Sequence, residues 1–238
     1  MDKDVVVIVY HGSKDDDKNQ AFLNFVDHLN LQAWDDGNAR FIGCYIEQAE
    51  PTINQIMQQR DSLYGRVYIF SLLFLRGKHY NKDVKGVIEA YEQEINKNTV
   101  LLPPLCEDDL FLTYVVERLY SVYNQPVIIA AHGSAHDTRA NDALEQLTTL
   151  LEQQYSRPSS SLFLFGEGQH AVLEQFSFRY ELFYILPLTF GKGAVYEQFK
   201  DRVLGYPKAK LLPPVYFDKS LQNYVLLKLK SLREDVEK

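Results

Sequence analysis

The sequence has few cysteines, no long apolar run and no excess of positive charge, and each absence excludes a class of protein. Cys44 and Cys106 form no spacing motif, so we expect reduced core residues and no disulfide. No run approaches the roughly 18 apolar residues of a membrane span, and the short run Val5–Val9 after an acidic start is unlike a signal peptide. The formal net charge of −7 argues against nucleic-acid binding, which needs a basic face. We therefore expect a cytoplasmic protein that binds neither nucleic acid nor membrane.

The chain repeats itself. Its 238 residues, 46% of them hydrophobic, are enough for two ordinary globular cores. Three landmarks occur in the same order in both halves: VVVIVYHGS at 5–13 and VIIAAHGS at 127–134, RGKH at 76–79 and FGKG at 190–193, and LLPPL at 101–105 and LLPPV at 211–215. The sequence therefore predicts two tandem domains related by internal duplication, which we place at residues 1–123 and 127–238.

Short apolar runs alternate with amphipathic stretches in both halves. We expect strands at 5–10, 41–46, 66–75 and 99–102, and again at 127–131, 161–165, 182–188 and 210–212. Apolar stripes between them indicate helices, and the first half is expected to close with a helix over 108–122. Continuously apolar strands are typical of parallel sheets covered on both faces. The predicted fold class is α/β, with two tandem doubly wound parallel-sheet domains.

Three side chains with metal-binding chemistry follow strands of the first half. His11 follows the first strand, Glu47 the second and His79 the third. Because ligands bind beyond the carboxyl ends of parallel strands, these side chains are placed to converge. Two imidazoles and a carboxylate suit a divalent ion such as Fe²⁺, Co²⁺, Ni²⁺ or Zn²⁺, and incomplete coordination leaves positions open for substrate or water. A single strand-end histidine also has a purely structural interpretation, so only the convergence favours a metal site.

The same stretches resemble a known family. The segment His11-Gly12-Ser13, the pair Ile46-Glu47 with Pro51, and Leu73–His79 with Asp83 resemble the sirohydrochlorin chelatases, the class II cobalto- and ferrochelatases, in their long, internally duplicated form. The resemblance implies a lyase that inserts Fe²⁺ or Co²⁺ into sirohydrochlorin or a closely related tetrapyrrole, in siroheme or cobalamin synthesis. It also implies catalytic roles for His11, Glu47 and His79. The two histidines would be the metal ligands, and Glu47 would be a further ligand or the proton acceptor.

The resemblance also implies how the substrate is held. The metal would be a substrate and no organic cofactor is implied, while the ring's carboxylates suit a mouth that carries basic side chains. The residues expected to bind the substrate are Ser13, Lys14, Arg76, Lys78 and Lys192. Lys14 departs from the family, which has arginine there, and loses bidentate recognition of carboxylates.

The second half is expected to be a degenerate copy. It retains His132 and Glu167 but has Gly193 where the aligned landmarks place His79. We expect it to form the other wall of a substrate cleft, which predicts a monomer. His136 and His170 are expected on loops and His28 on a helix, although His136 has an alternative place beside His132.

Two other functions remain open from the residues. A non-catalytic metal or tetrapyrrole carrier would use the same histidines, and only turnover separates it from an enzyme. A phosphatase with His11 as nucleophile would need a cluster of arginines, for which Lys14 is a poor substitute.

Overall fold

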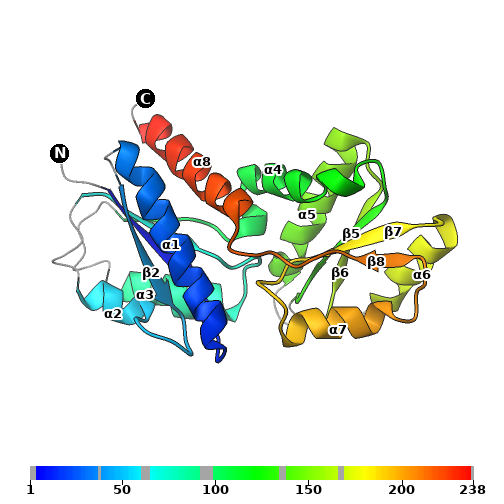
Figure 1. Ribbon diagram of the computed structural model, residues 1–238, viewed down its shortest axis with the longest axis horizontal. Coiled ribbons are helices and arrows are strands. Elements are labelled where there is room, and N and C mark those ends of the chain that lie inside the picture. The colour runs from blue at the N-terminus through cyan, green and yellow to red at the C-terminus, as the bar shows by residue number, and fades with distance from the viewer. Residues whose placement is uncertain are drawn as a thin grey trace. The chain divides into compact units, whose positions relative to one another are not determined.

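The structure is a computed structural model that describes residues 4–36, 39–59, 65–91, 99–133, 138–165 and 169–236. The chain forms two compact units, one of residues 1–105 and 217–238 and the other of residues 106–216. Each unit contains a four-stranded parallel sheet with helices (Figure 1). The predicted fold class, two doubly wound α/β repeats, is confirmed.

The first unit is built around β1. Its elements are β1 (Asp4–Tyr10), α1 (Asp16–Asp36), β2 (Ala39–Tyr45), α2 (Ile53–Gln58), β3 (Val67–Ser71), the π-helix η2 (His79–Lys85), α3 (Gly86–Tyr91), β4 (Thr99–Leu101) and α8 (Lys219–Val236). The strand order is β2-β1-β3-β4, with all neighbours parallel. After β1 the chain forms β2 on one side of β1 and then β3 on its other side. β1 and β3 therefore flank the switch point at which α/β sheets bind ligands.

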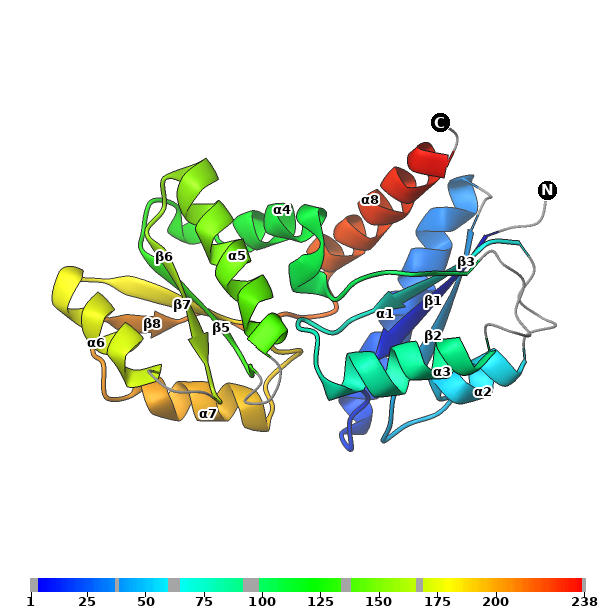
Figure 2. The same ribbon diagram turned by 180° about the vertical axis from the view of Figure 1, so that it is seen from behind.

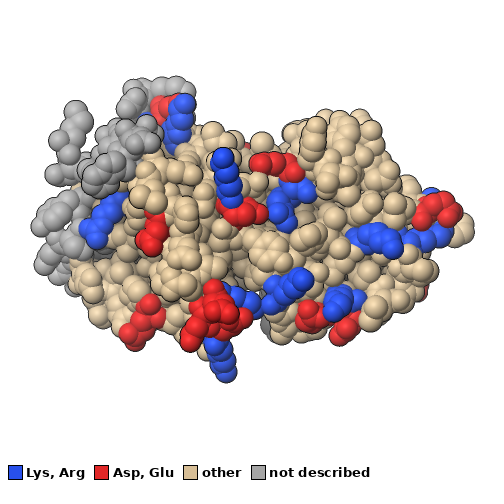
Figure 3. Space-filling model, viewed as in Figure 1, with Lys and Arg blue, Asp and Glu red and all other residues tan. Residues whose placement is uncertain are grey.

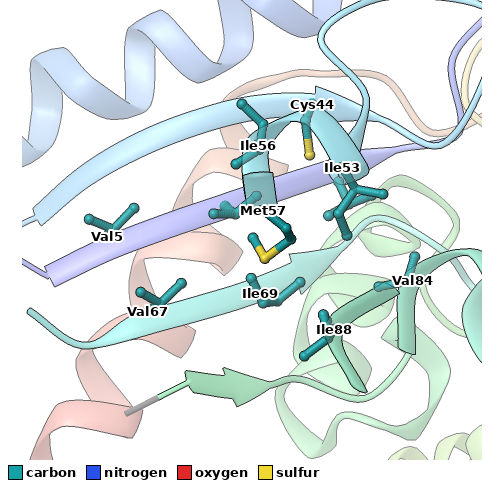
Figure 4. Packing of buried hydrophobic residues seen from close by; sticks show 11 residues of the cluster. Val5, Cys44, Ile53, Ile56, Met57, Val67, Ile69, Val84 and Ile88 are labelled. Carbon is teal, nitrogen blue, oxygen red and sulfur yellow. The ribbon is translucent and has the colours of Figure 1, made fainter. Parts of the chain in front are cut away.

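Alternating side chains of the first sheet pack against helices on its two faces. Val5, Val7 and Val9 of β1 lie in a buried cluster with Met57 of α2 and Ile88 of α3. Figure 4 shows this cluster between the sheet and the two helices. The opposite face is aromatic, since the Tyr10 ring lies 5.3 Å from Phe22 of α1. Burial of these strands on both faces explains their unbroken apolar runs.

The second unit repeats the topology. Its elements are η3 (Leu105–Glu107, which begins one residue before the unit), α4 (Asp109–Arg118), η4 (Tyr120–Val122), β5 (Val127–Ala131), α5 (Thr138–Tyr155), β6 (Ser159–Phe163), α6 (Gln169–Arg179), β7 (Phe183–Pro187), α7 (Ala194–Val203) and β8 (Ala209–Leu211). The strand order β6-β5-β7-β8 matches that of the first sheet (Figure 2). His170, expected on a loop, lies in α6.

A buried arginine fixes the segment that enters β5. The Arg157 guanidinium donates to the backbone carbonyls of Gln125 at 2.8 Å and Val122 at 2.7 Å. It also reaches the carbonyl of Leu119 at 3.5 Å, and the residue is only 5% exposed. Burial lowers the pKa of Arg157. These carbonyls at the end of a helical segment are the acceptors that a cation stabilises best.

The unit boundaries differ from the predicted 1–123 and 127–238. Helix α4, from the first half of the sequence, packs on α5 of the second unit, and α8, from the end of the chain, packs on α1 of the first. Figure 1 shows α1 and α8 side by side. Tyr224 of α8 contacts Phe70 of β3 with ring centroids 5.8 Å apart, and Arg233 donates to Asp4 of β1 at 2.9 Å. The apolar stripe of a helix shows which face is buried but not which sheet it covers, so the sequence did not reveal this exchange.

The cysteines, the helix lengths and the surface charge bear on the expectations drawn from composition. Cys44 and Cys106 are free and buried, as predicted, and burial raises the pKa of both thiols, so neither supplies a thiolate at neutral pH. Within the described ranges, every helix is too short or too polar to cross a membrane. Figure 3 shows positive and negative side chains mixed over the described part of the face that it draws.

Candidate metal centre

Three side chains converge at the carboxyl edge of the first sheet. The Nε2 atom of His11 lies 3.2 Å from Nε2 of His79 and 3.6 Å from Oε1 of Glu47. One ligand atom from each of the three residues lies within 4.8 Å of the others. Ligand atoms that share a tetrahedral ion, with bonds of about 2.0–2.1 Å, are about 3.4 Å apart. The expected convergence of these residues is therefore present, and the two distances from His11 Nε2 are close to this spacing.

Hydrogen bonds beyond the strands bring Glu47 beside His11. The β1–β2 pairing continues past both strands, because Ile46 N–H donates to the Tyr10 carbonyl at 2.9 Å and Glu47 N–H to the His11 carbonyl at 3.0 Å. Gly12 makes this approach possible, since it has a φ of +93° and an added Cβ would lie 1.9 Å from the Glu47 carbonyl oxygen. The glycine of the His-Gly turn is thus required by both its backbone conformation and the space available.

Replacing Gly12 with alanine is expected to lower the free energy of unfolding by about 2–5 kcal/mol, the combined cost of a positive φ and of forcing the Glu47 backbone away. Gly77→Ala is the matched control, because within the described residues an added Cβ there has no neighbour within 4 Å. Urea unfolding of both variants measures the difference. Equal stability of the two would show that the turn relaxes freely and does not fix Glu47.

Each imidazole is oriented through its other nitrogen. His79, at the start of the π-helix, has Nδ1 2.8 Å from Oδ2 of Asp83, and His11 has Nδ1 3.1 Å from the Gly12 carbonyl. These acceptors favour the tautomer with hydrogen on Nδ1, which leaves each Nε2 lone pair directed at the shared position. His79 and Asp83 are four residues apart in this helical segment, a spacing that places two side chains on the same face of a helix. Asp83 is the residue of this centre to which the sequence analysis gave no role.

Replacing Asp83 with alanine is expected to weaken Co²⁺ binding by about 10–100-fold, the usual effect of removing a carboxylate that orients a ligand histidine. Glu89→Ala is the control, since Glu89 forms an exposed pair with Lys85 at 3.3 Å in the adjoining helix. Isothermal titration gives both affinities. If the two variants bind Co²⁺ equally well, Asp83 does not position His79.

The centre is open to solvent. The side chains of His11, Glu47 and His79 are 38%, 48% and 37% exposed, so an ion held there retains coordination positions for other ligands. Tyr10 adds no anionic ligand, because burial, and then Tyr45 and Asp15, raise its pKa to about 12. The donor set is therefore nitrogen and carboxylate oxygen.

The loop after His11 is held by a residue that the sequence analysis missed. Asn19 accepts from Ser13 N–H at 3.0 Å and donates to the Ser13 carbonyl at 2.7 Å. The Ser13 amide is therefore occupied. Ser13 Oγ also accepts from Asp15 N–H at 3.1 Å. The only sequence signal was an asparagine in the first turns of a predicted helix.

The expected substrate-binding cations lie in different surroundings. The Arg76 guanidinium lies over the Tyr80 ring, 4.8 Å from its centroid, whereas Lys14, Lys78 and Lys192 are exposed. Their binding of substrate carboxylates stays a prediction.

Within the described residues, the second unit lacks two of the three donors. Phe165 N–H donates to the His132 carbonyl as Glu47 N–H does to that of His11, so Phe165 occupies the position of Glu47. Glu197 N–H donates to the Gly193 carbonyl as Asn81 N–H does to that of Gly77. Gly193 therefore corresponds to Gly77, and Val195 to His79.

These correspondences correct the alignment made from the sequence. The sequence analysis matched Gly193 with His79 and Lys192 with Lys78. The backbone hydrogen bonds instead give Lys192 the position in the second unit that Arg76 has in the first. The Gly-Lys pair of the second unit therefore lies two residues earlier in its loop than the Gly-Lys pair of the first. Glu167, expected to be the counterpart of Glu47, lies outside the described residues, as does His136. Among the described residues, only the first unit brings three metal-binding groups together.

A doubly wound α/β unit with two imidazoles and a carboxylate at its switch point has the donor set of a divalent-metal site. The model of the CbiX family matches residues 5–122. This segment, which carries His11, Glu47 and His79, is similar to the CbiX family.

Solved structures share the fold over nearly the whole chain. SirB from Bacillus subtilis with Fe³⁺ has a TM-score of 0.77 at 17% identity, covering 96% of this chain and 95% of that one. The sirohydrochlorin chelatase SirB from Bacillus subtilis subspecies spizizenii, in complex with cobalt, has a TM-score of 0.73 at 16% identity, covering 99% and 97%. CbiX, described as the terminal enzyme of siroheme biosynthesis in denitrifying bacteria, has a TM-score of 0.69 at 14% identity, covering 96% and 99%. A comparison with curated protein sequences gives no significant match.

Proposed function

We propose that this protein is a sirohydrochlorin chelatase that inserts Fe²⁺ or Co²⁺ into sirohydrochlorin or a closely related tetrapyrrole. The observation that carries the proposal is the open cluster of His11, Glu47 and His79, whose ligand atoms lie within 4.8 Å of one another. The match of residues 5–122 to the CbiX family model supports it. So does the likeness to a chelatase in complex with cobalt and to a related protein with Fe³⁺.

The chemistry requires two proton removals and one metal transfer. Two imidazoles hold a divalent ion through Nε2 while leaving positions for ring nitrogens, so the ion can exchange protein ligands for ring ligands. Each pyrrole N–H must lose its proton as its nitrogen binds the metal. The Glu47 carboxylate, 3.6 Å from His11 Nε2 and half exposed, is the base placed beside the ion. The metal is a substrate that leaves with the product.

Turnover tests the proposal. Purified protein at a small fraction of the sirohydrochlorin concentration is mixed with Fe²⁺ or Co²⁺ in parallel anaerobic assays, and the loss of the metal-free absorption spectrum is followed. A chelatase forms many equivalents of metallated product above the uncatalysed rate. Product that stops at one equivalent would instead establish a carrier. The relative rates with Fe²⁺ and Co²⁺ assign the metal, which the donor set does not fix. The cytoplasmic location and the monomeric state stay predictions.

A further inference from the structure

An exposed pair of aromatic rings lies where the second unit would carry its metal site. The rings of His132 and Phe165 have centroids 4.5 Å apart and an interplanar angle of 60°. Phe165 is 46% exposed and His132 is also exposed. Both follow strands, β5 and β6, at the carboxyl edge of the sheet, where folds of this type bind ligands.

The turn that presents His132 has kept its geometry, although Phe165 and Val195 occupy the positions of Glu47 and His79. Gly133 has a φ of +74°, and an added Cβ would lie 2.9 Å from side-chain atoms of Phe163. His132 has Nδ1 3.1 Å from the Gly133 carbonyl, the same arrangement as in His11. The turn after β5 therefore holds the His132 imidazole as the turn after β1 holds that of His11. Phe165 stands beside His132 where Glu47 stands beside His11.

Hydrogen bonds from α7 hold the backbone at the end of β6. Arg202 of α7 donates to the carbonyl of Phe163 at 3.2 Å and reaches that of Leu164 at 3.5 Å. Val195, at the position of His79, packs against the core cluster of the unit. Phe165 thus projects from a fixed backbone, which is what a preorganised binding surface requires.

We infer that His132 and Phe165 form a stacking platform for one face of a planar, carboxylate-bearing macrocycle. The inference rests on the proposed function, since the ligand that it assigns to this surface is the tetrapyrrole substrate. Aromatic rings gain about 0.5–1.5 kcal/mol from offset or edge contacts beyond the area that they bury, so a flat conjugated ligand suits this pair better than an aliphatic one. The exposed Lys192 follows β7 at the same edge and suits the ligand's carboxylates. Phe165 stands at the position that Glu47 has in the first unit, so this edge of the second sheet suits a flat ring rather than a metal ion.

Binding of metal-free sirohydrochlorin to the full chain, measured by fluorescence quenching without any metal, tests the platform. Phe165→Ala is expected to raise the dissociation constant about 5–10-fold, near 1–1.4 kcal/mol at 1.4 kcal/mol per tenfold. Phe165→Trp should retain the wild-type affinity. Phe178→Ala is the matched control, because Phe178 lies on α6 of the same unit and is 90% exposed. Co²⁺ affinity should be the same in all four proteins, which shows that the first unit is intact.

The outcomes separate the platform from the proposed function. If the wild type binds sirohydrochlorin and Phe165→Ala binds it as well as Phe178→Ala does, the platform is wrong and the chelatase assignment stands. If Phe165→Leu binds as well as the wild type, the site needs only apolar area, and stacking is overturned. If the wild type neither binds the ring nor metallates it, the proposed function fails and the platform fails with it.

Discussion

Replacing His79 with alanine is expected to abolish tight Co²⁺ binding, whereas replacing His132 is expected to leave it unchanged. His79 supplies one of two Nε2 atoms that face each other at 3.2 Å, and its loss leaves a single imidazole and one carboxylate. The affinity should fall by more than the roughly 10–100-fold that follows the loss of an orienting carboxylate. His132 has Phe165 beside it in place of a carboxylate, so its removal takes away no metal site.

Isothermal titration of the metal-free protein with Co²⁺ is the measurement. The wild type should bind one equivalent tightly, His79→Ala none, and His132→Ala one equivalent with the wild-type affinity. Two equal sites in the wild type, or loss of the tight site with His132→Ala alone, would contradict the assignment of the metal to the first unit. Melting temperatures of the variants identify any loss of the fold.

Replacing Glu47 with glutamine is expected to lower the turnover number by roughly 10²-fold or more, the usual contribution of a general base. Glutamine keeps the size and the exposed position of the side chain but cannot accept a pyrrole proton at neutral pH. Co²⁺ affinity should fall less than turnover, because His11 and His79 remain. Steady-state assays at saturating metal, together with titration of the same variant, give both quantities.

The opposite pattern would reassign Glu47. If the variant binds Co²⁺ weakly but turns over normally at saturating metal, Glu47 is a ligand and the proton acceptor is another group. Asp83→Ala provides a comparison, because Asp83 contacts His79 Nδ1 rather than the shared position and should affect metal binding in preference to proton transfer.

Much of the fold follows from local pattern. Runs such as Val5–Tyr10 and Val127–Ala131 are apolar without interruption because helices cover both faces of each sheet, and the strands form where the runs predict them. The exception is the expected strand at 66–75, of which only Val67–Ser71 pairs. Its remainder leads to the π-helix, whose seven residues have no distinct sequence signature.

The candidate site was predicted in part. Placement after parallel strands was enough to bring His11, Glu47 and His79 together, since the edge of a sheet is shared by its strands. The alignment of the two units was wrong because it matched the repeated Gly-Lys. The β5–β7 pairing instead gives Val195 the position in the second unit that His79 has in the first. Phe165 was not singled out, because it is the last residue of the expected strand at 161–165, and an aromatic residue in a strand is ordinarily interpreted as core.

The exchange of α4 and α8 reverses the order in which the units are completed during synthesis. The second unit is one continuous segment, 106–216, and all of it has been translated before the ribosome reaches α8. The first unit, which carries the metal centre, must wait with part of one face of its sheet uncovered, because Phe217 and Tyr224 contact Tyr10 and Phe70 only after the segment that contains α8 emerges. Proteins usually complete their N-terminal domain first. Here the nascent chain holds a fully translated second unit and an unfinished first one, so it gains a complete metal-binding unit only after α8 has been translated.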